Sequence, residues 1–163
     1  MPAAATSRFM KVSGATGESP ISGHEQESEV IGFQWGVLHP ASVQSGTGGS
    51  AGRTTFQDFT CMCYVDNAYP SIVGFCAGGK SIDEVKITAL KMTGEKGETF
   101  LTWTFSDVMC TGITNSGNQD AQDVITYSFQ AAKMKVEYKP QQTKGGTLGG
   151  TNETSWDVKK NTK

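Results

Sequence analysis

The sequence predicts an all-β fold with one short helix, in which curled sheets form a two-sheet barrel or sandwich. Hydrophobic residues recur mainly with a period of two, Gly and Ser cluster between these segments, and one segment carries helix start and stop signals. A length of 163 residues, a formal net charge of -2 and 36% hydrophobic residues suit one globular domain, which we assign to residues 1–163.

Seven segments show the alternation of apolar and polar residues that is typical of half-buried strands: residues 8–12, 29–37, 54–65, 82–92, 101–105, 123–138 and 155–160. In the second, the side chains expected on the buried face are Ile31, Phe33, Trp35 and Val37. In the third, they are Phe59, Cys61, Cys63 and Val65. The apolar phase of residues 123–138 slips by one residue, which predicts a β-bulge near Ala131 and Ala132.

The one helix is expected between Asp66 and Gly79. Asp66 or Asn67 can cap its start, Pro70 suits its first turn, and two glycines suit its end. Glycine and serine also crowd into residues 44–53 and 143–152, which predicts two long exposed loops. Loops of this length inside a compact domain usually have a partner or a function.

Charge and composition exclude several classes of partner. Because the chain has 16 acidic and only 14 basic side chains, we expect no basic surface that would bind nucleic acid. No apolar stretch is long enough to span a bilayer, and the first residues lack the apolar core of a signal peptide, so we expect neither membrane insertion nor general secretion. The four cysteines are interpreted as small core residues in a reducing cytoplasm.

The most specific motif match is GFCAGGKS at residues 74–81, which satisfies the P-loop pattern G-x-x-x-x-G-K-[ST]. A P-loop follows a strand and opens a helix, so that amides and the positive helix end meet the phosphates. Here a helix precedes the glycines and a strand follows them. We therefore interpret the glycines as a helix C-cap and expect no nucleotide site.

Other catalytic patterns are incomplete. His24 begins HEQES, but Ser28 stands where a zinc hydrolase needs its second histidine, so this segment is interpreted as surface residues leading into a strand. No C-x-x-C pair and no G-x-S-x-G elbow occurs. We expect no catalytic residues, no metal and no cofactor, and so no enzyme.

The ordered set of residues resembles the hemolysin-coregulated protein (Hcp) family of type VI secretion systems over nearly the whole chain. The residues that carry the resemblance are Gly17, Glu18, Ser19, His24, Gln34, Trp35, Gly36, Gly52, Arg53, Asp66, Pro70, Cys76, Gly79, Lys80, Lys91, Gly94, Val136, Glu137, Tyr138, Pro140, Gln141 and the strand Trp156–Lys160.

This resemblance implies a barrel-like subunit that closes into a homohexameric ring, with rings stacking into the inner tube of the secretion machine. It also implies as partners a spike protein, a contractile sheath and baseplate, and secreted effectors carried in the lumen. The protein would reside in the bacterial cytoplasm and then leave through the machine. For contacts between stacked rings we nominate Gly46, Thr47, Gly48, Gly49, Ser50, Gly52 and Arg53, and for the lumen Gln34.

An alternative is a monomeric β-sandwich module that binds a sugar or a peptide through the same loops, because aromatic strands and exposed loops suit that role as well.

Overall fold

The computed structural model describes residues 6–42, 50–51, 53–93, 96–140 and 149–163. One helix, α1, spans Tyr69–Gly78. The strands are β1 Thr6–Val12, β2 Ser28–Gln34, β3 Val37–Leu38, β4 Ala41–Ser42, β5 Ser50–Ala51, β6 Thr55–Phe56, β7 Phe59–Tyr64, β8 Ser81–Thr93, β9 Lys96–Asn118, β10 Ala121–Tyr138 and β11 Asn152–Asp157. The prediction of an all-β chain with one short helix is confirmed. The predicted loop over residues 44–53 contains β5, and the loop predicted over 143–152 ends where β11 begins.

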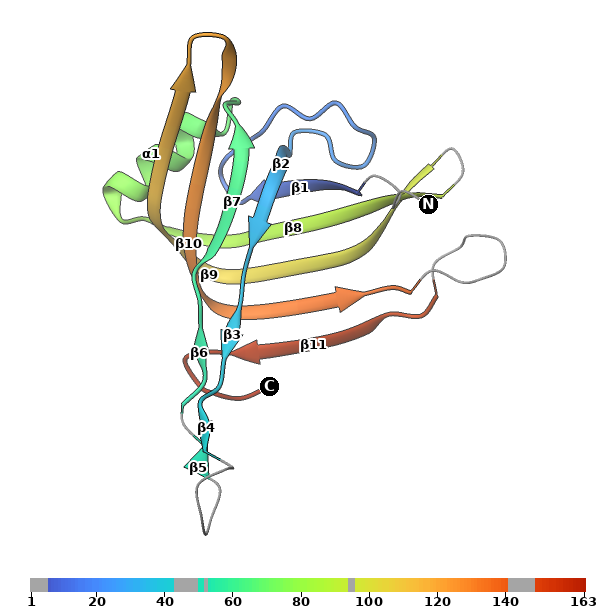
Figure 1. Ribbon diagram of the computed structural model, residues 1–163, viewed down its shortest axis with the longest axis vertical. Coiled ribbons are helices and arrows are strands. Elements are labelled where there is room, and N and C mark those ends of the chain that lie inside the picture. Colours follow the sequence, from blue (N-terminus) through green and yellow to red (C-terminus); the bar gives the residue numbers. More distant parts are fainter. Residues whose placement is uncertain (1–5, 43–49, 52, 94–95, 141–148) are drawn as a thin grey trace.

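Six strands close into a barrel in the order β10-β7-β2-β1-β8-β9, because β9 pairs back with β10. Strands β9 and β10 are 23 and 18 residues long and bend (Figure 1). The first half of β10 pairs with β7, and its second half pairs with β11 instead. Because the barrel is closed, each of the six strands has a neighbour on both sides where it is paired. The barrel thus avoids the exposed strand edges through which open sheets aggregate.

Aromatic side chains fill the barrel around Phe59. Its ring stacks on Phe105 at a centroid distance of 3.8 Å and on Phe129 at 5.1 Å. Phe59, Cys61 and Cys63 are buried as predicted. Val65 is exposed, contrary to prediction, because β7 ends at Tyr64 and the chain turns toward α1.

The predicted facing of residues 29–37 was wrong at both ends. Val30 is 8% exposed and Ile31 is 47% exposed, because the pairing of β2 with β7 shifts register between Val30 and Gly32 and leaves Ile31 as the extra residue. Val37 is exposed because the chain has left the barrel by that point. Phe33 and Trp35 do pack against the core.

The predicted bulge was misplaced by a few residues. The pairing of β10 with β9 shifts register between Ser128 and Phe129, where β9 carries the extra residue Thr111, and not at Ala131–Ala132. Asp107 on β9 adopts a left-handed φ of 52° where the strands bend. The alternation of apolar residues in β10 changes phase near the bend, but the extra residue lies on β9. The sequence of β10 alone could therefore not show where the bulge is.

Helix α1 begins with a proline in its first turn and ends at Gly79, whose φ of 60° is left-handed, as the glycine predicted. The predicted cap was wrong: Ala68 occupies the N-cap position, and no side chain caps it. Asp66 lies two residues earlier, where its Oδ1 accepts a hydrogen bond of 3.0 Å from the Ala68 backbone N–H. Proline in the first turn already removes one unpaired donor, which lessens the need for a cap.

Asp66 makes stability depend on pH. Burial raises the pKa of its carboxyl and nearby Glu18 adds to this, against hydrogen bonds from Ser28 and Ala68 that lower it. A raised pKa means that the fold prefers the neutral acid, so its contribution is complete below the ordinary aspartate value and is lost as pH rises through the folded value. We expect Asp66→Asn, which keeps the acceptor, to gain stability relative to the parent as pH rises.

Since Asp66 is only about half buried, solvent screening limits the expected gain to about 1 kcal/mol or less. Urea denaturation at a series of pH values between about 3 and 7 measures it. The matched control is Asp120→Asn in the exposed turn between β9 and β10. A difference between Asp66→Asn and the parent that does not change with pH contradicts the prediction.

Candidate functional site

A two-stranded arm projects from the barrel (Figure 1). It consists of β3 paired with β6 and, further out, β4 paired with β5. Val37 and Leu38 on β3 are 42% and 56% exposed, although β3 is an apolar strand. A short two-stranded ribbon is only marginally stable in water by itself. We therefore expect contact with a further surface to stabilise this arm.

Of the residues predicted for ring stacking, Ser50 and Arg53 belong to this arm. Ser50 lies on β5 and pairs with Ser42, and Arg53 is exposed between β5 and β6. Gly46, Thr47, Gly48, Gly49 and Gly52 lie outside the described residues. Gln34 is at the end of β2, where the chain leaves the barrel, so the arm strands separate it from Ser50 and Arg53 (Figure 1).

Gln34 belongs to the outward face of the barrel wall formed by β2, β7 and β10. It is exposed and pairs with Thr60, which pairs in turn with Ser128. The next row of this face comprises Gly32, Met62 and Thr126, and Tyr64 pairs with Val124 beyond it. None of the side chains in these three rows is charged, and we call the three rows the uncharged outward face: neutral polar groups together with the exposed Met62 and Tyr64. The exposed Glu29 on β2 lies at its margin, where it lines a depression together with Tyr64.

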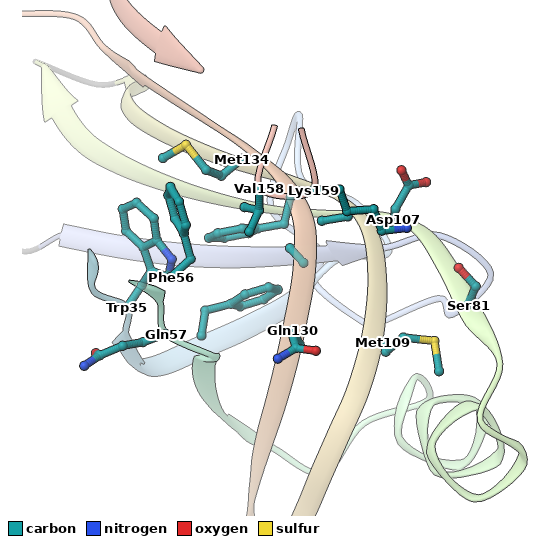
Figure 2. Close-up of a pocket in the computed structure, with 14 residues that line it drawn as sticks. Trp35, Phe56, Gln57, Ser81, Asp107, Met109, Gln130, Met134, Val158 and Lys159 are labelled. Atoms are coloured by element: carbon teal, nitrogen blue, oxygen red, sulfur yellow. The ribbon is translucent and has the colours of Figure 1, made fainter. Parts of the chain in front are cut away.

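A cleft of about 440 Å³ opens where the arm joins the barrel (Figure 2). Figure 2 shows Trp35, Phe56 and Gln57 at one end and Ser81 and Met109 at the other. Its lining comes from segments that are distant in the sequence: Trp35, Phe56, Gln57, Phe59, Ser81, Phe105, Asp107, Met109, Gln130, Ala131, Ala132, Met134, Val158 and Lys159. The sequence analysis missed this cleft, because no motif marks it and only the bend of β9 and β10 assembles it.

The GFCAGGKS segment is the end of α1 followed directly by β8, as predicted. The Gly79 N–H donates to the Cys76 carbonyl at 3.3 Å, and the Lys80 N–H donates to the Phe75 carbonyl at 2.9 Å. Lys80 Nζ lies over the Phe75 ring, 5.0 Å from its centroid. These amides complete the helix and do not point to an anion, so the geometry is that of a C-cap.

His24 is not the surface residue that the sequence predicted. It is 9% exposed and its ring stacks on Phe9 at 4.6 Å. Its Nδ1 lies 2.9 Å from Glu27 Oε2, an ion pair when the imidazole is protonated. The loop over residues 17–27 therefore covers the outer side of β1, which explains why both Phe9 and Met10 are buried on one strand.

Within the part of the chain that the structure describes, no group of three or more His, Cys, Asp or Glu side chains is placed to bind a metal ion. No helix among these residues has the length and apolar character that a membrane span requires. The site thus consists of the arm, the uncharged outward face and the cleft. All three can form contacts with another molecule.

Residues 9–138 match the family described as Type VI secretion system effector, Hcp. The chain belongs to the Hcp family.

Known Hcp proteins resemble the chain over nearly its full length. Protein hcp1 of Pseudomonas aeruginosa is 30% identical over 160 residues, which cover 96% of this chain and 98% of that protein. The crystal structure of Hcp1 from Salmonella typhimurium has a TM-score of 0.81 at 26% identity, with 97% and 98% of the two chains covered. A structure of a type six secretion system protein has the same fold, with a TM-score of 0.90 at 24% identity and 96% and 98% coverage.

Membership in the Hcp family makes this chain a protein of the type VI secretion system, secreted through that system. Hcp proteins are structural proteins of the system. This agrees with a site made of contact surfaces.

Proposed function

We propose that the chain is the subunit of a hexameric ring, that rings stack into the inner tube of the secretion system, and that effectors travel in the lumen. The observation that carries the proposal is the arm. It exposes apolar residues on a ribbon that is too short to be stable alone, and another copy of the chain would bury them. A contact of this kind between unlike surfaces forms a ring when the rotation from one copy to the next closes after six copies.

The remaining surfaces take roles consistent with this assembly. Ser50 and Arg53 on the arm would contact the next ring, together with the other residues nominated for this role, Gly46, Thr47, Gly48, Gly49 and Gly52. Gln34 and the uncharged outward face would line the lumen, where neutral side chains let cargoes of either charge pass without strong electrostatic trapping. Spike protein, sheath and baseplate are the further partners that this role requires. The protein would wait in the cytoplasm before export and have no catalytic activity of its own.

Assembly is tested on the purified full chain by negative-stain electron microscopy and native mass spectrometry. We expect uniform annuli with a central hole and a mass of six subunits. Leu38→Asp places a charge on the arm, and we expect it to shift the population to monomers while the circular dichroism spectrum stays that of the parent.

The matched control is Val73→Asp on the exposed side of α1, which should leave the rings intact. Monomers of the parent chain at high protein concentration would refute the ring. Intact rings in Leu38→Asp would refute the role of the arm.

The cleft supports a second candidate function, a monomeric module that binds a sugar or peptide. Its lining combines the aromatic rings of Trp35 and Phe56 with the amides of Gln57 and Gln130, a composition that suits such ligands. A monomer whose melting temperature rises with an oligosaccharide or peptide would favour this candidate over the ring.

A further inference from the structure

Strands β1, β8, β9, β10 and β11 are paired in this order and lie side by side (Figure 1). Their inward side chains, such as Met10, Ile87 and Phe105, are buried. The side chains next to these along each strand therefore lie on the outer side of the sheet. Five of them are directly opposite one another and form a row across the strands, which we call the lysine row: Lys11, Lys86, Thr104, Lys135 and Ser155.

Two lysines of this row are direct cross-strand neighbours. Lys11 on β1 is paired with Lys86 on β8. Like charges that are directly opposite in an antiparallel pair destabilise it. Among the described residues neither of these two lysines forms an ion pair, whereas Lys135 lies 3.4 Å from a Glu137 carboxylate oxygen and 3.2 Å from one of Glu153. The sheet therefore keeps an unfavourable pair of charges on its outer side that no carboxylate of the described chain offsets.

The rows on either side of the lysine row carry carboxylates. One contains Glu84, and the other contains Glu137 and Glu153. Lys133 lies in the row of Glu84, but its ammonium is 3.8 Å from the Asp107 carboxylate. The excess of positive charge is thus confined to the lysine row. A nucleic acid backbone on this side of the sheet would also meet the carboxylates, whereas a narrow acidic segment along the row would not.

We propose that the lysine row binds an acidic helical segment of another protein, whose Asp or Glu side chains lie along the row. Neighbouring strands are about 4.8 Å apart, so successive members of the row are separated by about this distance. Side chains three or four residues apart on a helix share a face and are about 5–6 Å apart. One helix can therefore bring a carboxylate to each lysine and to the Thr104 hydroxyl between Lys86 and Lys135.

The partner is another protein and not a second copy of this chain. Helix α1 is the helix of the described residues, and its segment Tyr69–Gly78 contains neither Asp nor Glu. The lysine row also lies outside the arm, the uncharged outward face and the cleft. The inference therefore goes beyond the proposed function and does not depend on ring formation.

The test measures the binding of a fluorescently labelled, alanine-based helical peptide to the full chain by fluorescence anisotropy. The peptide carries glutamates at alternating spacings of three and four residues, and the control peptide carries glutamines in the same places. We expect only the glutamate peptide to bind. We also expect its affinity to fall as the sodium chloride concentration rises from about 0.02 to 0.3 M, because salt screens exposed charges.

Lys86→Gln should weaken binding of the glutamate peptide about two- to five-fold, and Lys11→Gln combined with it about ten-fold, since each exposed ion pair contributes little. Lys86→Gln should melt at the same temperature as the parent or up to about 3 °C higher, because it removes the repulsion from Lys11. A lysine that served only the fold would lower the melting temperature when replaced. The matched control is Lys160→Gln, which removes the same charge from the exposed turn after β11 and should leave binding and melting unchanged.

Three results would overturn the proposal: equal binding of the glutamate peptide by Lys86→Gln and the parent, equal binding of the two peptides, or tighter binding of a single-stranded oligonucleotide than of the glutamate peptide. These variants leave the arm unchanged. Ring formation is therefore measured separately, and either test can fail without affecting the other.

Discussion

Replacing Phe105 by Ala should lower the free energy of unfolding by about 3–5 kcal/mol. The ring is 1% exposed, stacks on Phe59 and meets the edge of Trp35 at a centroid distance of 5.8 Å. Its removal leaves a cavity between strands that the closed barrel cannot collapse, because β9 is paired on both sides at this residue. The loss should appear in urea denaturation at matched protein concentration, since assembly makes the midpoint depend on concentration.

Trp103→Ala is the matched control, two residues earlier on the same strand. Trp103 is larger but only half-buried, and its main aromatic contact is Phe33 at 4.6 Å. We expect it to lose less than Phe105→Ala, about 1–3 kcal/mol. A loss below about 1 kcal/mol for Phe105→Ala, or a larger loss for Trp103→Ala, would show that the barrel centre is placed wrongly.

Gly17→Ala should lower the free energy of unfolding by about 2–4 kcal/mol. A Cβ at this position would lie 2.4 Å from the Glu27 carbonyl carbon, a backbone atom that no side-chain rotation can move. Gly17 N–H also donates to the Gln26 carbonyl at 2.7 Å, which holds the two ends of the loop together. The methyl group would push the loop of residues 17–27 away from β1. This would expose Phe9, which the loop covers, and His24, which is part of the loop.

Gly74→Ala is the matched control for this substitution. Gly74 lies inside α1 with open space where its Cβ would be, so alanine should stabilise the helix by about 0.5–1 kcal/mol. Thermal denaturation of both variants gives the sign of each change in stability. Losses of the same sign and size in the two variants would contradict the close approach at Gly17.

The sequence predicted the strands well where one face is buried and the other is not. Cys61, Cys63, Val85 and Ile87 face the core as their alternation required. It failed where register changes, as at Ile31, because a bulge depends on the partner strand and leaves little trace in the strand that carries the pattern. It also failed at His24, since the aromatic partner of that ring, Phe9, lies far from it in the sequence.

The candidate site was predictable only in part, because alternation within one strand could be predicted and contacts between distant segments could not. Exposed Gln34 is outward on its strand, as the alternation of residues 29–37 indicated. The cleft depends on which segments the bend of β9 brings side by side, and no local pattern encodes that. Resemblance to a family could name the fold but not the residues that line this cleft.

The length of the β9–β10 ribbon has a mechanical consequence. Force applied along this ribbon is shared by many residue pairs of the ladder at once, so they must break together. The described residues of the arm form only a few such pairs, which can open one after another. We therefore expect a load on the subunit to deform the arm before the barrel wall, so that the proposed tube would flex at the contacts between subunits and stay rigid within each one.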